Sequence, residues 1–305
     1  MPHNRTPMAD PAPVDEHLEA PPAIAFAGAT LDRAAHLRDD SERLRALENP
    51  RAVLVGTGQE IAVTGAGTLA LAPVADLPSD AVLTFLGLDG SGGAVFAYDA
   101  APAELASLRS LMAELDPAEA ALAAYAVGMI GWHRVHRHCG RCGHATVVEQ
   151  AGHRRRCPNC GLMQFPRTDP AVTMLVQNRD QCLLSRRHGA PENRWSALAG
   201  FVEPGETPEQ AVVREACEET GVTVHAVEYV TSQPWPFPAA LMIGFWAFVD
   251  PEGETTAPVP EPSELVEARW WDRAELADAV ENDRIGLPPP GTIGNYLISS
   301  WVARG

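Results

Sequence analysis

The sequence contains no lysine, so its 23 strongly basic side chains are all arginines. A planar guanidinium holds phosphate oxygens with two hydrogen bonds, which suits a protein that handles phosphate groups. Positive charge is scarce overall, because 40 acidic side chains give a net charge of −17. This balance argues against a protein that coats nucleic acid or an anionic membrane through its overall field.

The opening residues are not expected to be a secretory signal, and the sequence lacks a long apolar segment. Residues 1–22 are rich in proline, alanine and acids, which predicts a disordered tail instead. The longest apolar run, Ala118–Trp132, contains Glu119 and two glycines and is too short to cross a bilayer comfortably. We therefore expect a buried helix in that run, no membrane partner and a cytoplasmic protein.

The scarce positive charge is concentrated in the middle of the chain. Residues 131–200 contain 11 arginines against 4 acidic residues, whereas residues 1–130 contain 7 against 18 and residues 201–305 contain 5 against 18. The arginines at positions 134, 137, 141, 154, 155 and 156 form what we call the basic island. A cluster of this kind is able to hold the phosphates of an RNA.

Length and patterning divide the chain into parts, because 305 residues exceed the usual size of one domain. We expect a disordered tail at 1–22, an N-terminal α+β lobe at 23–135, a cysteine-bearing insert at 136–166 and a C-terminal domain at 167–305. In the lobe, the patterns predict strands at 51–55, 61–63, 82–86 and 94–98, and helices at 103–115 and 118–130.

The C-terminal part alternates between strand and helix patterns. Strands are predicted at 172–177, 182–186, 222–230, 241–249 and 268–271, and helices at 207–220, 273–281 and 292–303. Such a mixture is typical of an α/β sandwich. The proline-rich stretch 251–262 is expected to be a loop insertion.

Four of the six cysteines form two Cys-x-x-Cys pairs: Cys139 with Cys142, and Cys157 with Cys160. Two such pairs present four thiolates in a tetrahedron, which is how structural zinc is held. Disulfide or redox chemistry is the alternative interpretation. Because four thiolates leave no open position, we expect one structural Zn²⁺ per chain that does not activate water. The nearby histidines at 136, 138, 144 and 153 are then ordinary surface residues.

A glutamate-rich pattern runs from Gly200 to Val222 and follows G-x5-E-x7-R-E-U-x-E-E-x-G-U, where U is apolar. Seven fixed identities at typical residue frequencies make a chance match rarer than about one in 10⁸ per start position. The seven are Gly200, Glu206, Arg214, Glu215, Glu218, Glu219 and Gly221.

Local signals inside the pattern predict a helix. Thr207 and Gln210 form a capping box, Pro208 suits the first helical position, and Gly221 suits a left-handed C-cap. The helix should therefore run from about Pro208 to Thr220.

This helix carries three carboxylates on one face, because Glu215 precedes Glu218 by three residues and Glu219 by four. Crowded carboxylates repel one another unless cations neutralise them. Mg²⁺ or Mn²⁺ would do so and would also bridge to substrate phosphates. A solvated acidic face with ordinary pairing to Arg214 is the alternative.

A second run, Ser232–Pro238, alternates three prolines with Trp235 and Phe237. It predicts a stiff, extended loop that presents flat surfaces for stacking a base or a nicotinamide ring. From the residues alone, a packing role for the two aromatic side chains is equally compatible.

These motifs together resemble a known family. The pattern at 200–222 resembles the signature of the Nudix hydrolase superfamily, which cleaves nucleoside diphosphates linked to another group. Ser232–Pro238 looks like the SQPWPFP signature of the NADH pyrophosphatases, a branch that also removes NAD caps from RNA. The resemblance covers Cys139 to the end, and the N-terminal lobe matches only in position and size. The signature often closes with serine where this chain has Ala240.

The resemblance implies a fold, an assembly and roles for individual residues. It implies an α/β protein with an N-terminal α+β lobe, a four-cysteine zinc ribbon and a C-terminal Nudix α/β/α sandwich, assembled as a homodimer with composite sites. Glu215, Glu218, Glu219 and Glu264 would hold catalytic Mg²⁺ or Mn²⁺, Arg214 would orient a glutamate, and Glu206 would support the loop. The implied substrate-binding residues are Phe165, Phe201, Gln233, Pro234, Trp235, Pro236, Phe237 and Pro238. The run 287–292 resembles the family's C-terminal site loop.

The implied activity is metal-dependent hydrolysis of the pyrophosphate of NAD(H) to nicotinamide mononucleotide and AMP. Removal of NAD caps from RNA 5′ ends uses the same chemistry, and the basic island favours an RNA substrate. Two alternatives remain at this point: a broader nucleotide-sugar or ADP-ribose pyrophosphatase, and a zinc-ribbon binding protein that does not catalyse.

Overall fold

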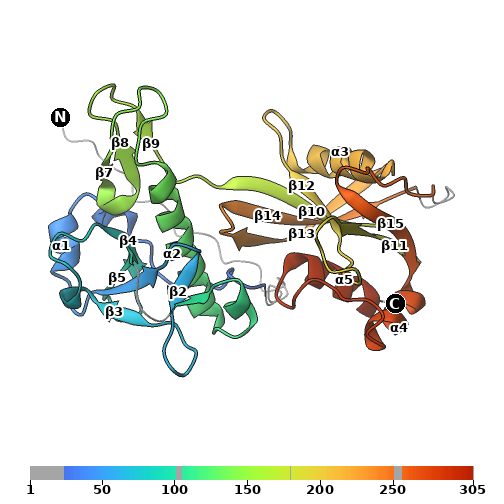
Figure 1. The fold of residues 1–305 in the computed structure, drawn as a ribbon, viewed down its shortest axis with the longest axis horizontal. Helices are drawn as coiled ribbons and strands as arrows, with labels where there is room; N and C mark the ends of the chain where they lie inside the picture. Colours follow the sequence, from blue (N-terminus) through green and yellow to red (C-terminus); the bar gives the residue numbers. More distant parts are fainter. Residues whose placement is uncertain (1–23, 101–104, 179, 251–255, 305) are drawn as a thin grey trace, which may run out of the picture.

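The computed structural model describes residues 24–100, 105–178, 180–250 and 256–304. Two α/β units lie at opposite ends of an elongated molecule, and a small three-stranded sheet lies beside the first unit (Figure 1). The predicted tail at 1–22 lies outside the described residues.

The first unit is built on a sheet with the strand order β4-β5-β1-β2-β6, and β3 pairs with β1. Its strands are β1 (Arg51–Val55), β2 (Glu60–Ala62), β3 (Leu71–Pro73), β4 (Leu83–Leu88), β5 (Ala94–Asp99) and β6 (Leu105–Ser107). A short helix, α1 (Ser41–Arg45), and a long one, α2 (Pro117–Val135), complete the unit. All four strands predicted in this region are confirmed within two residues at each end.

The helix predicted at 103–115 is wrong. Residues 105–107 form β6, which pairs antiparallel with β2, and only residues 110–113 form a single 3₁₀ turn. The alanine- and leucine-rich composition favours a helix locally, but a short apolar run is ambiguous between the two structures. Backbone pairing with a distant strand decides the outcome here.

Helix α2 confirms the buried helix predicted for the longest apolar run. The side chain of Asp116 accepts a hydrogen bond from the Ala118 amide at 2.9 Å, and Pro117 occupies the first turn. Nine of its side chains are buried, chiefly alanines that let the sheet approach closely. None of the described helices has the length and apolarity needed to cross a membrane.

The cysteine-bearing insert forms the small antiparallel sheet. Its strands are β7 (Val147–Glu149), β8 (Arg154–Arg156) and β9 (Met163–Gln164), in that order. The side chain of His153 bonds the carbonyl of Phe85 in β4 at 2.7 Å, which ties the insert to the first unit.

The second unit is a sheet between two layers of helices. Its strand order is β13-β14-β10-β11-β15, with β12 paired to β10. The strands are β10 (Asp169–Gln177), β11 (Gln181–Arg187), β12 (Leu198–Phe201), β13 (Ala226–Trp235), β14 (Ala240–Phe248) and β15 (Leu265–Asp272). The helices are α3 (Pro208–Thr220), α4 (Arg273–Glu281) and α5 (Ile293–Ala303).

Alternating side chains of β10 serve the two cores of this unit. Val172, Met174 and Val176 pack with the buried face of α3, whereas Leu175 packs with α4 and α5. Figure 1 shows α3 on one side of the sheet and α4 and α5 on the other. The predicted α/β/α sandwich is therefore confirmed.

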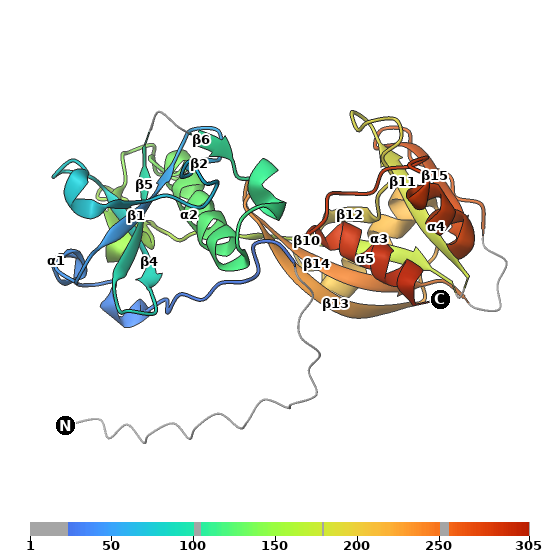
Figure 2. The ribbon, with the colours of Figure 1, turned by 90° about the horizontal axis from the view of Figure 1, so that it is seen from below.

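One strand boundary differs from the prediction in a way that matters for the site. The strand expected at 222–230 begins at Ala226 and continues to Trp235, where it pairs with the start of β14. The first half of the Ser232–Pro238 run is thus strand rather than loop, and the turn to β14 follows directly. Figure 2 shows these two strands extending toward the first unit.

Candidate active site and metal centre

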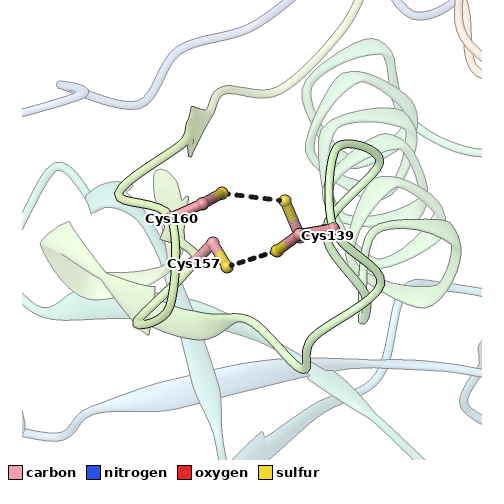
Figure 3. A group of neighbouring side chains, drawn as sticks. Cys139, Cys157 and Cys160 are labelled. Atoms are coloured by element: carbon pink, nitrogen blue, oxygen red, sulfur yellow. Dashed lines mark hydrogen bonds between the residues drawn. The ribbon is translucent and has the colours of Figure 1, made fainter.

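The four cysteines predicted to bind zinc lie together (Figure 3). The Sγ atoms of Cys139 and Cys160 are 3.6 Å apart, those of Cys142 and Cys157 are 3.5 Å apart, and all four lie within 4.8 Å of one another. Thiolates at about 2.3 Å from a tetrahedral Zn²⁺ lie about 3.8 Å apart. The four-cysteine zinc site therefore needs almost no rearrangement to hold the ion.

Hydrogen bonds favour the thiolate form of Cys142. Hydrogen bonds from the backbone of His144 and the side chain of Asn159 lower the pKa of the Cys142 thiol to about 5. The nearby imidazole groups have other partners: His136 contacts the Trp132 carbonyl, and His144 contacts the Cys142 carbonyl. Among the described residues the metal-binding group consists of the four cysteines alone, as predicted.

Loss of one zinc ligand should unfold the ribbon. Because Cys157 is fully buried in the cluster, Cys157→Ser should release one zinc per chain and lower the unfolding midpoint by about 10 °C or more. Metal analysis and calorimetry measure both effects, with Cys217→Ser, an exposed cysteine on α3, as the control. Retained zinc with an unchanged midpoint would contradict the assignment.

Most arginines of the basic island have partners of their own. Arg154 and Arg156 bind Glu149 at 2.8 and 2.6 Å, and Arg134 and Arg137 bind Asp99 at 2.6 and 3.4 Å. Arg155 is buried and bonds the Thr146 hydroxyl at 2.7 Å. In the described part of the chain only Arg141 of the island lacks such a partner. Two carboxylates therefore offset two of the island's six positive charges, and they hold four of its arginines in fixed positions.

Helix α3 confirms the local prediction to the residue. The hydroxyl of Thr207 accepts from the Gln210 amide while the Gln210 side chain accepts from the Thr207 amide, which closes the capping box. Gly221 takes the left-handed conformation at φ 69° and its amide bonds the Cys217 carbonyl. The helix start and end are thus determined by local side chains.

Arg214 organises the glutamates of the pattern. Its guanidinium bonds Glu206 at 2.8 and 2.9 Å, Glu215 at 2.9 Å and Glu218 at 2.8 Å, and it also donates to the Phe201 carbonyl. The ion pair with Arg214 lowers the pKa of Glu206, which also accepts from the Glu203 amide. The roles expected for Arg214 and Glu206, orientation and loop support, agree with these contacts.

Glu219 is the most deeply buried of these glutamates, with 1 % of its side chain exposed. Its Oε1 accepts from Arg187 at 2.5 Å, while its Oε2 is buried and has no hydrogen-bond partner among the described residues. Burial raises the pKa of Glu219 to about 7; Arg187 opposes that shift, and the neighbouring Glu215 and Glu264 add to it. A cation would satisfy both the bare oxygen and the crowded charge.

Glu215 lies against the backbone of Gly200 in β12. A methyl group at Gly200 would overlap the carboxylate of Glu215, so only glycine leaves room for this side chain. Burial raises the pKa of Glu215, and nearby Glu264 contributes to that shift. The first glycine of the pattern therefore serves the placement of a glutamate rather than a turn.

Two of the predicted metal-binding glutamates, Glu215 and Glu264, and part of the proline-rich run line one cavity of about 460 Å³. Its lining includes Arg187 beside these glutamates, and Trp235, Phe237 and Pro238 of the run. Phe201, with 59 % of its surface exposed, lies on its rim. The structure thus brings Glu215, Glu264 and the aromatic pair to one cavity, although they are far apart in the sequence.

The contacts of Gln233 require a correction, because the structure does not place this residue in the cavity. Its side chain is buried and donates to the carbonyls of Ala25 and Gly291 at 3.1 and 2.9 Å, and its oxygen accepts from the Ile293 amide at 2.9 Å. With its polar atoms occupied by backbone, Gln233 joins three chain segments instead of contacting substrate.

The first unit packs against the aromatic pair of the proline-rich run. Phe26 lies 6.2 Å from Trp235 and 6.0 Å from Phe237 between ring centroids, and Arg109 lies over both rings at 5.1 and 4.5 Å. Gln59 bonds the carbonyl of the buried Pro236 at 3.1 Å. The pair therefore has a packing role as well as a place in the cavity wall.

Phe165 is the one expected aromatic residue outside the cavity lining. It follows β9, is 57 % exposed and is close in sequence to the exposed Met163. The segment 287–292 is held by Gln233 through Gly291 rather than by the glutamates.

Sequence reasoning missed Arg187 and Arg109. Arg187 ends β11 and Arg109 precedes a short 3₁₀ turn, and neither belongs to a motif. Only the folded arrangement connects Arg187 to Glu219 and Arg109 to the aromatic pair.

Comparison with known proteins agrees with this architecture. Residues 167–288 match the NUDIX domain model, and residues 134–165 match the model for the NADH pyrophosphatase zinc ribbon domain. The chain is 36 % identical over 97 % of its length to the NAD-capped RNA hydrolase NudC of Mycobacterium bovis, covering 99 % of that protein.

Other relatives match over part of their length. The chain is 40 % identical to the NAD-capped RNA hydrolase NudC of Stutzerimonas stutzeri over 54 % of this chain and 55 % of that protein. It is 38 % identical to the human NAD-capped RNA hydrolase NUDT12 over 53 % of this chain and 37 % of that protein. A NUDIX hydrolase structure from Nitrosomonas europaea matches 50 % of this chain and 97 % of its own, at 21 % identity and a TM-score of 0.37.

Proposed function

Since the chain belongs to the NAD-capped RNA hydrolase family of Nudix hydrolases, we propose that it cleaves the pyrophosphate of NAD(H) and of NAD-capped RNA. One observation carries the proposal: Glu215 of α3 and Glu264 line the same cavity as the aromatic pair of the proline-rich run. The first group suits a metal-bound pyrophosphate, and the second suits a flat ring attached to it.

Metal binding would fall to the glutamates. Glu215, Glu218, Glu219 and Glu264 would hold Mg²⁺ or Mn²⁺, which supplies positive charge beside the phosphates and makes water more acidic. Arg214 holds two of these carboxylates in place, with support from Glu206.

Ring recognition would fall to the aromatic residues. Phe201 on the rim and the aromatic pair on the wall offer flat surfaces, and the prolines at 234, 236 and 238 stiffen their support. Gln233 acts as a positioning residue for this wall.

The reaction consumes one water molecule. Its oxygen joins one phosphorus, and the bridging oxygen leaves with the other phosphate. The products are nicotinamide mononucleotide and AMP, or, from capped RNA, nicotinamide mononucleotide and an RNA with a 5′-monophosphate.

We also infer a homodimer in a reducing compartment such as the cytoplasm. The exposed Met163 and Phe165 at the edge of the ribbon favour a covered apolar surface, and all six cysteines are free thiols. In such a dimer Phe165 would reach the site of the partner subunit. Light scattering measures the mass directly, and a monomer at micromolar concentration would overturn this part.

Competition between substrates tests the function. NADH, NAD-capped RNA and ADP-ribose are offered together with Mg²⁺ or Mn²⁺, and the products are followed by chromatography. We expect NADH and capped RNA to be cleaved with kcat/KM at least about tenfold above that of ADP-ribose, the scale of 1.4 kcal/mol in transition-state binding. Faster cleavage of ADP-ribose would support the broader pyrophosphatase, and no cleavage would overturn the proposal.

A further inference from the structure

A second cavity, of about 600 Å³, lies between the first unit, the ribbon and the Nudix sheet. It shares Trp235, Ala239 and Ala240 with the catalytic cavity, so the two meet at the proline-rich run. The catalytic cavity is lined by Asp169, Glu203, Glu215 and Glu264. The second cavity is lined by no acidic side chain among the described residues.

Three arginines line the second cavity: Arg33, Arg38 and Arg167. Arg167 is paired with Asp169. Neither Arg33 nor Arg38 forms an ion pair with any residue that the structure describes, although the chain carries 40 acidic side chains. Unpaired arginines in so acidic a protein indicate a place kept for an anion from outside the chain.

Two polar atoms beside these arginines have no hydrogen-bond partner in the described structure. They are Nε of Arg38 and the hydroxyl of Tyr125, and both are shielded from water. The guanidinium of Arg33 lies 4.1 Å from the centre of the Tyr125 ring, so the three side chains form one group. An unsatisfied buried polar atom costs free energy that a bound oxyanion would recover.

A neighbouring histidine reports the positive field of this group. Burial, with added repulsion from Arg38 and Arg33, lowers the pKa of His153 to about 4, against the effect of its hydrogen bond to the Phe85 carbonyl. His153 is therefore neutral at pH 7, and the arginines remain the charged groups of the cavity.

We propose that the cavity lined by Arg33, Arg38 and Tyr125 binds a backbone phosphate of the RNA that follows the NAD cap. This inference rests on the proposed function, because only a capped RNA carries phosphates beyond the pyrophosphate. The glutamates of the acidic cavity would hold metal whose charge offsets that of the pyrophosphate, whereas phosphates farther along the RNA would lie beyond those glutamates and would need arginine. The shared wall at Trp235 connects the two positions.

The test compares two variants that each remove two positive charges. Arg33→Gln with Arg38→Gln empties the cavity of its unpaired arginines, and Arg137→Gln with Arg141→Gln removes two from the basic island. Arg33→Gln with Arg38→Gln should lower kcat/KM for an NAD-capped 10-nucleotide RNA about tenfold or more. The kcat/KM for NADH should stay within about twofold of the wild-type value. For capped RNA, the slope of log kcat/KM against the logarithm of the salt concentration should be less steep in this variant than in wild type. The expected difference is about 0.7 for each phosphate contact that is lost. Arg137→Gln with Arg141→Gln should leave kcat/KM for both substrates within about twofold of the wild-type values.

A third variant separates binding from folding. Tyr125→Phe removes a hydroxyl that has no partner in the free protein, so the unfolding midpoint should stay the same or rise. A KM for capped RNA raised severalfold, with NADH unchanged, would support the phosphate contact. An unchanged KM for capped RNA in both this variant and Arg33→Gln with Arg38→Gln would overturn it.

The remaining outcomes are distinguishable. If wild-type protein cleaves neither substrate, the proposed function fails; if it cleaves both and the two double variants lose capped RNA equally, the cavity has no special role. Inorganic phosphate is the probe for a free anion. Inhibition of NADH cleavage by phosphate that disappears in Arg33→Gln with Arg38→Gln would assign the cavity to a small anion and overturn the RNA assignment.

Discussion

Glu219→Gln should lower kcat for NADH by about 10³-fold or more while KM changes little, because the loss falls on charge stabilisation in the transition state. Glutamine keeps the shape of the side chain but removes the negative charge from a site with 1 % exposure. The measurement is a steady-state assay at saturating Mg²⁺ and Mn²⁺. Glu209→Gln, on the exposed first turn of the same helix, is the matched control and should retain full activity.

Glu219→Gln should also change how the folding stability depends on pH, in a direction set by the pKa of Glu219. Glu219 has a pKa of about 7 in the folded protein and an ordinary value of 4.5, so the folded state binds more protons between these values. Stability of the metal-free wild type should therefore fall as pH rises from about 4.5 to 7 and remain low above it. The stability of metal-free Glu219→Gln should not fall in this way over the same pH range, because glutamine does not titrate.

Divalent metal should stabilise the wild type more than Glu219→Gln, the opposite of the order expected without metal. Wild type should gain in unfolding midpoint on addition of Mg²⁺ above pH 7, because the cation binds only the folded carboxylates. Glu219→Gln should gain much less. Normal turnover in the variant, or an equal gain with metal, would remove Glu219 from the metal site.

Features encoded by neighbouring residues were predictable from the sequence. The limits of α3 follow from Thr207, Pro208 and Gly221, all within one turn of the helix ends. The zinc site follows from two short cysteine pairs and a tetrahedral metal. In both cases the chemistry depends on spacing along the chain, which a sequence displays directly.

Features that depend on distant partners were not predictable. Gln233 looked like a substrate contact because it lies within a recognised run, yet its partners at Ala25 and Gly291 are 208 and 58 residues away. The same limit applies to β6, which pairs with β2, and to Arg187, which reaches Glu219 of α3 from the end of β11. Residues of this kind have no local signal.

The basic island shows that composition does not reveal which arginines of a surface have acidic partners. Six arginines close in sequence suggested a phosphate-binding patch, but Glu149 and Asp99 each pair with two of them. The net charge of a segment does not include acidic partners that come from other parts of the chain. The arginines left without acidic partners at the second cavity, Arg33 and Arg38, lie outside that segment.

Gly200→Ala should lower kcat by about 10²-fold although no charged residue changes. The new methyl group would overlap the carboxylate of Glu215, which is the far end of a flexible side chain, whereas β12 is held by its pairing with β10. The side chain should therefore move while the strand stays, which takes Glu215 out of its bond with Arg214. Circular dichroism and the unfolding midpoint should change little, and Gly131→Ala in α2, where a methyl group meets open space, is the control.

A double-mutant cycle establishes whether Gly200 acts through Glu215. If it does, Gly200→Ala combined with Glu215→Gln should be no slower than the slower single variant, because both changes remove the same carboxylate from the same place. Additive losses would mean that the methyl group disturbs something else, such as the β12–β10 pairing or the neighbouring Phe201. The coupling energy therefore separates a glycine required for the close approach of a catalytic group from one required for the fold itself.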